Sequence, residues 1–258
     1  MTPVGPGDGH GLLAGKTVLV TAAAGTGIGS AAALRCAAEG ATVAISDRHE
    51  RRLAEAARTL AEQTGETPLA IGCDGTDQAQ VDHLIDTVDA ELGGIDVLIN
   101  NVGLGGTASI VDMTDDQWNS VLDVTLTATF RATRAVLRHM VPRRRGVIVN
   151  NASVLGWRAQ AGQAHYAAAK AGVMALTRCA AMDVAQYGIR INAVSPSIAV
   201  HPFLAKVTTE GALAELVSRE AFGRAAEPWE VANVMVFLAS DYSSYLTGEV
   251  VSVSSQHP

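Results

Sequence analysis

The sequence predicts an α/β fold, in which one domain is built on a doubly wound, parallel sheet of seven strands. Three observations support this prediction. Short runs rich in β-branched residues alternate with segments of helical periodicity from residue 16 onward. The runs are almost continuously apolar, which is typical of strands buried on both faces of a parallel sheet. The composition does not change along the 258 residues in a way that would mark a second domain.

The expected elements follow this alternation in order. The seven strands are Lys16–Ala22, Ala41–Ser46, Pro68–Cys73, Asp96–Asn100, Gly146–Ala152, Ile189–Val194 and Glu249–Val253. Between them lie Ala- and Leu-rich segments of helical period, among them Arg51–Glu62 and Ala79–Leu92. Thr114 followed by Gln117 forms a capping box, which predicts that a helix begins there.

Two segments lie outside this alternation. Residues 1–11 combine glycine and proline and have neither a basic start nor an apolar core, so we expect a flexible tail and no secretion signal. Residues 199–225 carry no strand signal and one helix-like run, Glu210–Arg219, which predicts a small substrate lid. The domain itself is expected to span residues 12–258.

The composition excludes several classes of function. A net charge of −7 argues against nucleic acid or an anionic membrane surface as the main partner. No apolar stretch approaches the roughly 18 residues of a membrane span. The three cysteines (Cys36, Cys73 and Cys179) are far apart and lack metal-ligand spacing, so we expect reduced thiols, no bound metal and a cytoplasmic location.

A glycine-rich turn follows the first expected strand. It reads Gly25-Thr26-Gly27-Ile28-Gly29 and continues directly into an Ala-rich helix. Glycines at such a turn let the backbone approach a pyrophosphate, whose charge lies at the helix N-terminus. The strand, turn and helix together predict a dinucleotide site in a Rossmann-type sheet.

An acidic residue, Asp47, follows the second expected strand. A carboxylate there can bind both hydroxyls of an adenosine ribose and would repel a 2′-phosphate, which favours NAD over NADP. The alternative is that Asp47 caps the next helix. Arg48, Arg51 and Arg52 favour the opposite specificity, because arginine can accommodate a 2′-phosphate; we rank the acid above them.

Three residues in the second half of the chain have the chemistry of proton transfer. Tyr166 and Lys170 are four residues apart, so they share a helix face and the ammonium lies beside the phenol. A neighbouring cation favours phenolate and lowers the pKa of a phenol from its usual value near 10. The hydroxyl of Ser153, just upstream, could orient a carbonyl or alcohol oxygen.

With these motifs, the chain resembles the short-chain dehydrogenases/reductases across residues 12–256. Besides the glycine turn and Ser153, Tyr166 and Lys170, the matching segments are CDGTD, NNVG and NAVSPS. The cofactor contacts that the resemblance implies in and beside these segments are Asp74, Gly75, Asn101, Val102, Gly103, Pro196 and Ile198.

The resemblance implies hydride transfer between a nicotinamide and the carbon of a carbonyl or secondary alcohol. It implies that Tyr166 is the general acid/base and that Ser153 binds the substrate oxygen. Lys170 would lower the pKa of Tyr166 and hold the nicotinamide ribose. The family habit further implies a homotetramer, built through the two long helices that carry Thr125 and Tyr166.

The chain departs from the family pattern at several positions. Its glycine turn is one residue longer than usual, and Ala22 or Ala23 stands where the first glycine would be. Thr125 takes the place of the usual catalytic Asn, where its hydroxyl could hold a relay water. Ser197 replaces a glycine, and His201 replaces a threonine that commonly touches the carboxamide. We expect these departures to mark a distinct branch and not an inactive enzyme.

Within the family, the chain resembles an actinobacterial branch of steroid-catabolism reductases. These act on a ring hydroxyl of a methyl-hexahydroindanone carboxyl-CoA thioester, and the segments NNASVLGWRAQ and GEVVSVSSQ carry the similarity. It implies an NAD(H)-dependent enzyme that interconverts a secondary alcohol and a ketone on a bulky ring substrate. The alternatives are a 3-oxoacyl thioester reductase using NADPH and, in another class, a non-catalytic nucleotide-binding subunit.

Four residues are candidates for substrate contact. Trp157 and Arg158 follow Ser153 in a loop that should line the site. Arg158 could meet a carboxylate or phosphate, or pair with a surface acid. His201 and Phe203 lie in the expected lid, where His201 is either a second acid/base or a packing residue.

Overall fold

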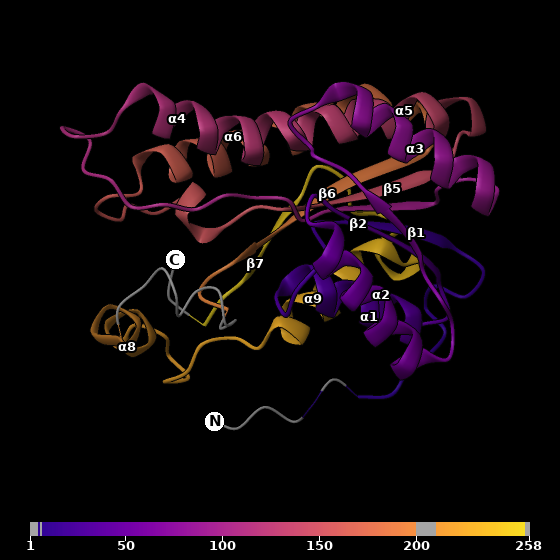
Figure 1. Cartoon of the computed structure of the whole chain (residues 1–258), viewed down its shortest axis with the longest axis horizontal. Coiled ribbons are helices and arrows are strands. Elements are labelled where there is room, and N and C mark those ends of the chain that lie inside the picture. The colour runs from indigo at the N-terminus through magenta and orange to yellow at the C-terminus, as the bar shows by residue number, and fades with distance from the viewer. Residues whose placement is uncertain (1–4, 6, 200–209, 256–258) are drawn as a thin grey trace.

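The computed structural model of the chain describes residue 5, residues 7–199 and residues 210–255 (Figure 1). Its centre is a parallel seven-stranded sheet in the order β3-β2-β1-β4-β5-β6-β7. The strands are β1 (Thr17–Thr21), β2 (Thr42–Asp47), β3 (Leu69–Gly72), β4 (Val97–Asn100), β5 (Gly146–Asn151), β6 (Ile189–Pro196) and β7 (Val250–Val253). The predicted fold class is confirmed, and each expected strand ends within two residues of the observed one.

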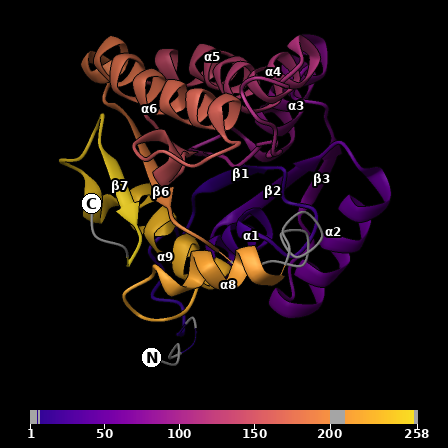
Figure 2. The ribbon, with the colours of Figure 1, turned by 90° about the vertical axis from the view of Figure 1, so that its left-hand side faces the viewer.

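Helices cover both faces of the sheet. One layer holds α3 (Gln78–Leu92), α4 (Asp115–Leu122), α5 (Ala128–Arg143) and α6 (Ala164–Val184). The other holds α1 (Ile28–Ala38), α2 (Glu50–Thr64) and α9 (Pro228–Ala239). Helix α8 (Glu210–Ser218) lies on the α1 and α9 side, beyond the sheet (Figure 2). The three-layer arrangement is Rossmann-like.

The strand order reverses between β1 and β4. From β1 the chain adds β2 and β3 on one side, then crosses back to place β4 on the other side. The connections that follow β1 and β4 therefore leave the sheet in opposite directions. In open α/β sheets, ligands bind in the crevice that this reversal opens at the carboxyl ends of the strands.

The apolar core lies on both faces of the sheet, as the continuous apolar strands predict. In β1, Val18 and Val20 belong to the cluster under α1 and α9, whereas Leu19 belongs to the cluster under α3 and α5. Val97 and Leu98 of β4 divide in the same way. Each of these side chains is fully buried, because successive side chains point to opposite faces and both faces are covered.

Side-chain hydrogen bonds mark the start of α4 and join the N-terminal tail to the end of α1. The capping box at Thr114 and Gln117 is present, and α4 begins at Asp115. The described part of the tail contacts the C-terminal end of α1. Arg35 donates to the main chain of residues 7 and 8, and Glu39 accepts from the main-chain N–H groups of His10 and Leu12. Arg35 lies on α1 and Glu39 is its C-cap residue, and both side chains are buried.

The described ranges contain no helix that combines the length and the apolar character needed to cross a membrane. In the same ranges, no group of three or more His, Cys, Asp or Glu side chains is placed to hold a metal ion.

Candidate active site

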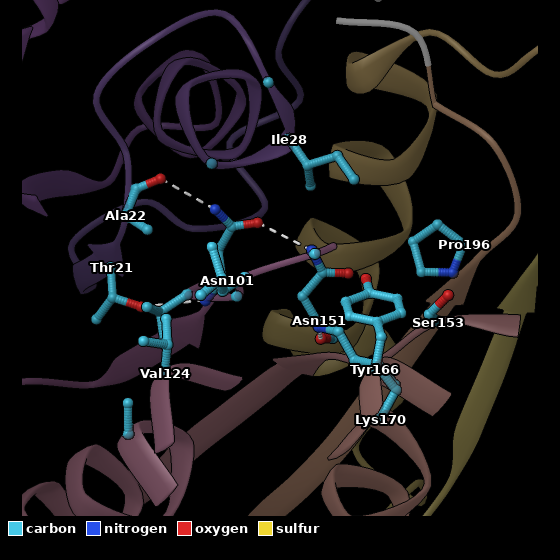
Figure 3. Close-up of a pocket in the computed structure, with 18 of the residues that line it drawn as sticks. Thr21, Ala22, Ile28, Asn101, Val124, Asn151, Ser153, Tyr166, Lys170 and Pro196 are labelled. Carbon is cyan, nitrogen blue, oxygen red and sulfur yellow. Dashed lines mark hydrogen bonds between the residues drawn. The ribbon is translucent and has the colours of Figure 1, made fainter. Parts of the chain in front are cut away.

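A cavity of about 1180 Å³ opens at the carboxyl ends of the strands, where the strand order reverses (Figure 3). It extends from the glycine turn to the N-terminal part of α6 and to α8. Most of the site residues expected from the sequence line it. These are Gly25, Thr26, Gly27, Ile28, Gly29, Asp47, Arg48, Asp74, Gly75, Asn101, Val102, Gly103, Ser153, Arg158, Tyr166, Lys170, Pro196 and Ile198.

Four expected site residues are not among the lining residues. Thr125 is fully buried behind the wall, and Trp157 is exposed on the surface. His201 and Phe203 lie outside the residues that the structure describes, as does most of the first part of the expected lid.

The glycine turn places backbone atoms at one end of the cavity. Its helix, α1, begins at Ile28, and the N-cap residue Gly27 has no side chain to cap it. A Cβ at Gly29 would overlap with the main-chain oxygen of Ala22 and with Nδ2 of Asn101. Ala22 itself has a φ of 51°, in the left-handed region that favours glycine. The turn therefore has no room for a side chain at position 29. The N-terminus of α1, which no side chain caps, faces the cavity.

Asp47 ends β2 at the cavity wall. Its carboxylate accepts from the main-chain N–H groups of Ala24 (3.3 Å) and His49 (3.0 Å), and Arg52 lies 4.0 Å away. Burial raises the pKa of Asp47, and the Ala24 N–H and the arginines oppose this rise. The N-cap of α2 is His49, so Asp47 does not cap that helix. Instead, it joins the glycine turn to the end of β2.

Asp74 follows β3 further along the same wall. Its carboxylate accepts from the main-chain N–H of Thr76 (2.9 Å) and from the Thr76 hydroxyl (2.8 Å). These hydrogen bonds hold the pKa of Asp74 below its usual value. The carboxylate is thus ionised and fixed at the cavity surface, next to Gly75.

Ser153, Tyr166 and Lys170 meet at the opposite end of the cavity. Ser153 begins the short turn after β5, and its Oγ accepts from the N–H of Leu155 (3.2 Å). The Ser153 hydroxyl lies close enough to the phenol of Tyr166 to lower its pKa. Lys170 Nζ lies 5.6 Å from the centre of the Tyr166 ring and donates to the main-chain oxygen of Asn151. The spacing of Tyr and Lys on one helix face therefore brings both to the serine.

The electrostatics of this group differ from the expectation. Burial raises the pKa of Tyr166 to about 12, and the neighbouring Ser153 hydroxyl lowers it by less. Burial also lowers the pKa of Lys170 to about 8. We expected the ammonium to lower the pKa of the phenol, but removal from water disfavours the charged form of both groups. Tyr166 is therefore a protonated phenol at neutral pH.

Thr125 lies in a π-helical segment, Asp123–Thr127, between α4 and α5. Its hydroxyl accepts from the main-chain N–H of Leu104 (3.0 Å) and donates to the oxygen of the same residue (3.4 Å). Its own main-chain oxygen accepts from the hydroxyl of Thr129 (2.8 Å). The threonine thus holds the loop that follows β4, and this loop carries Gly103 beside Lys170.

Asn151 was missed by the sequence analysis. Its Nδ2 donates to Oδ1 of Asn101 (2.9 Å), and Nδ2 of Asn101 donates to the oxygen of Ala22 (3.0 Å). Within the described part of the chain, Oδ1 of Asn151 is buried and has no partner. The available signal was the repeated Asn-Asn pair, because Asn100 and Asn150 are in register on β4 and β5.

The residues present fit a nicotinamide dinucleotide. The uncapped N-terminus of α1 suits a pyrophosphate. At Gly29 the helix approaches Ala22 and Asn101 too closely for a side chain, which is the close packing of helix and strand in a dinucleotide-binding turn. The unpartnered acceptor of Asn151 lies in the wall between the glycine turn and Tyr166.

Comparisons with known proteins agree with this geometry. A family model described as enoyl-(acyl carrier protein) reductase matches residues 22–255. The chain is 65% identical to the (5R,7aS)-5-hydroxy-7a-methyl-1-oxo-2,3,5,6,7,7a-hexahydro-1H-indene-carboxyl-CoA reductase of Mycobacterium tuberculosis, over 97% of this chain and 96% of that protein. It is 39% identical to a 3-oxoacyl-[acyl-carrier-protein] reductase of Thermotoga maritima, over 93% and 97% of the two chains.

A solved structure supports the same assignment. The crystal structure of a short chain dehydrogenase from Mycobacterium smegmatis superimposes with a TM-score of 0.89 at 58% identity. The match covers 100% of this chain and 99% of the other. The fold, the cavity and the relatives agree, and the chain belongs to the short-chain dehydrogenase/reductase family of oxidoreductases, which use nicotinamide nucleotides.

Proposed function

We propose that this chain is an NAD(H)-dependent oxidoreductase that interconverts a secondary alcohol and a ketone on a ring of a CoA thioester from steroid catabolism. The observation that carries the reaction is one continuous cavity. It joins the uncapped N-terminus of α1 to the side chains of Ser153 and Tyr166. The 65% identity to the M. tuberculosis reductase supports the substrate class.

The nicotinamide nucleotide, when bound, supplies or accepts the hydride. The backbone of residues 25–29 would hold its pyrophosphate, and Asp74 would lie near the adenine. The carboxylate of Asp47 would bind the adenosine ribose, which supports NAD over NADP. Arg48 lines the same part of the cavity and is the residue that would favour NADP.

Tyr166 is the proposed general acid in the direction of ketone reduction. With its pKa raised to about 12, the phenol holds its proton at neutral pH and can deliver it to the substrate oxygen. The Ser153 hydroxyl, which lies beside that phenol in the cavity wall, would orient the same oxygen. Lys170 would hold the nicotinamide ribose, and Thr125 would act indirectly by fixing the loop beside it.

The part of the cavity beyond Tyr166 would take the substrate. Its wall includes Gln163 and Arg158 from the loops around α6, and Leu216 and Arg219 from the end of the α8 region. A ring system would contact the apolar part, and an arginine would suit a phosphate or carboxylate of the thioester. We further propose that residues 199–225, of which 200–209 lie outside the description, form the substrate lid.

A binding titration tests the cofactor assignment. The purified protein is titrated with NADH and with NADPH while the nicotinamide fluorescence is followed. Tighter binding of NADH supports Asp47 as the ribose-binding acid. Tighter binding of NADPH would contradict it and would favour the 3-oxoacyl reductase alternative. Turnover with the CoA thioester of the relative's hydroxy-indanone acid, compared with a 3-oxoacyl thioester, then separates the two substrate classes.

We also propose a cytoplasmic homotetramer that is built through the two long helices that carry Thr125 and Tyr166. Phe130 on α5 is 40% exposed and Met182 on α6 is 66% exposed, and such apolar side chains suit contact with a second copy. The three free cysteines support a reducing compartment. Light scattering tests the assembly, and a monomer at micromolar concentration would contradict it.

A further inference from the structure

A chain of hydrogen bonds runs along the cavity wall from the glycine turn to Lys170. The oxygen of Ala22 accepts from Nδ2 of Asn101 (3.0 Å), and Oδ1 of Asn101 accepts from Nδ2 of Asn151 (2.9 Å) (Figure 3). The main-chain oxygen of Asn151 accepts from Lys170 Nζ. Two asparagine side chains therefore join the ends of β1, β4 and β5 to α6.

We propose that Asn101 and Asn151 are positioning residues that couple the conformation of the glycine turn to the position of the Lys170 ammonium. The inference rests on the proposed function, because it concerns nucleotide binding and catalysis in the same cavity. It assigns a role to Asn151, which the resemblance to the family did not include.

At the glycine turn, the chain of hydrogen bonds ends on Ala22, whose backbone conformation needs a restraint from outside the turn. Ala22 and Arg144 are the non-glycine residues of the described ranges with positive φ. Arg144 ends α5, where a left-handed residue is common, whereas Ala22 follows a strand. A left-handed alanine persists when its surroundings hold it there. The hydrogen bond from Asn101 to the oxygen of Ala22 is such a restraint, and Gly29 packs directly against it.

At the other end of the chain of hydrogen bonds, the Lys170 ammonium is restrained by Asn151. Lys170 is 2% exposed, and its ammonium donates to the main-chain oxygen of Asn151. Asn151 therefore contributes a main-chain acceptor to the lysine and a side-chain donor to Asn101. A rotation of the Asn151 peptide that lengthens the hydrogen bond to Lys170 also changes the hydrogen bond to Asn101, since both groups belong to one residue.

The register of the sheet makes this connection possible. Asn100 and Asn150 pair on β4 and β5, so the residues that follow them lie side by side at the carboxyl edge. The main-chain N–H of Asn101 also donates to Oγ1 of Thr21 (3.0 Å), which fixes Asn101 against β1. Asn101 is thereby held at its main chain, and its side chain is free to bridge the turn and Asn151.

The test compares Asn151→Leu, Ala22→Gly and the double variant. Leucine keeps the branching of the asparagine side chain and forms no hydrogen bond, so Asn151→Leu should raise the Kd for NADH about tenfold and lower kcat. Glycine adopts the left-handed conformation without a restraint. Ala22→Gly in the Asn151→Leu background should therefore restore the Kd to within about threefold of the wild type, while kcat stays low.

The single variant Ala22→Gly is the matched reference, because it changes the turn and keeps both asparagines; the Kd of the double variant for NADH should lie within about threefold of it. If Asn151→Leu does not fold, Asn101→Ser tests the same connection, because serine is too short to reach both partners. Ala22→Gly should restore its Kd in the same way.

Equal Kd and kcat values for the wild type and Asn151→Leu would overturn the inference and leave the proposed function intact. The same holds if Ala22→Gly fails to restore the Kd, because the asparagines would then not act through the turn. A wild-type protein that binds neither NADH nor NADPH would overturn the proposed function and this inference with it.

Discussion

The two ends of the cavity present different atoms to a ligand. The glycine turn presents main-chain groups, held by Asp47 and Asn101 from outside the turn. The α6 end presents the side chains of Ser153, Tyr166 and Lys170, which one helix and one strand end bring together. A substitution at the turn therefore changes the shape of the binding site, whereas a substitution at the α6 end changes the reactive groups of the site. Substitutions at each end of the cavity test this difference.

Tyr166→Phe should reduce kcat/KM by at least about 100-fold, because it removes the proposed proton donor and leaves the ring in place. The Kd for NADH should stay within about threefold of the wild type, since the turn is untouched. Steady-state kinetics and a fluorescence titration measure the two quantities. Wild-type kinetics would contradict the catalytic role and would favour the non-catalytic subunit.

Gly29→Ala should weaken NADH binding and destabilise the fold by about 3 kcal/mol, because the added methyl overlaps with Ala22 and Asn101. Urea unfolding and the NADH titration measure the effects. Gly211→Ala is the matched control, since nothing lies within 4 Å of the position where its Cβ would be. A Gly29→Ala protein as stable as this control would show that the turn is less tightly packed than described.

Lys170 should make stability depend on pH in a defined window. Its pKa is about 8 in the folded protein and 10.5 when unfolded, so between these values the unfolded state binds more protons. The free energy of unfolding should therefore rise by about 2 kcal/mol from pH 8 to pH 10, relative to Lys170→Met. Urea unfolding of both proteins at the two pH values provides the comparison. An unchanged difference would mean that Lys170 keeps an ordinary pKa.

Glu39→Gln tests the contribution to stability of the carboxylate at the C-terminal end of α1, away from the cavity. The pKa of Glu39 is lowered, with its main-chain hydrogen bonds and Arg35 outweighing burial, so the carboxylate stabilises the fold above pH 4.5. Glutamine should cost about 1 kcal/mol at pH 7, and the difference should disappear as the pH falls through the lowered pKa. Thermal unfolding with exposed Glu62→Gln as the control measures it. A difference in stability that persists at low pH would show that the charge of the Glu39 carboxylate does not stabilise the fold.

The sequence predicted those features that depend on neighbouring residues along the chain. Continuous apolar runs identify strands covered on both faces, and the four-residue spacing of Tyr166 and Lys170 places both on one helix face. The glycine turn could be located for the same reason, since strand, turn and helix are contiguous.

Features that depend on register or burial could not be predicted in this way. The contact between Asn101 and Asn151 requires that β4 and β5 pair in one register, which no local pattern specifies. The raised pKa of Tyr166 comes from burial that the completed fold creates. The anchoring of the tail by Arg35 and Glu39 was also missed, because charged residues on a helix are usually exposed.

The hydrogen bond between Asp47 and Ala24 has a consequence for redesign of the cofactor preference. Replacing Asp47 with alanine to admit a 2′-phosphate would also remove the acceptor that holds the glycine turn to β2. Serine or asparagine keeps an acceptor and removes the charge. An engineer who wishes to shift the proposed preference from NAD to NADP should therefore begin with those two residues, and judge success by the ratio of affinities together with the melting temperature.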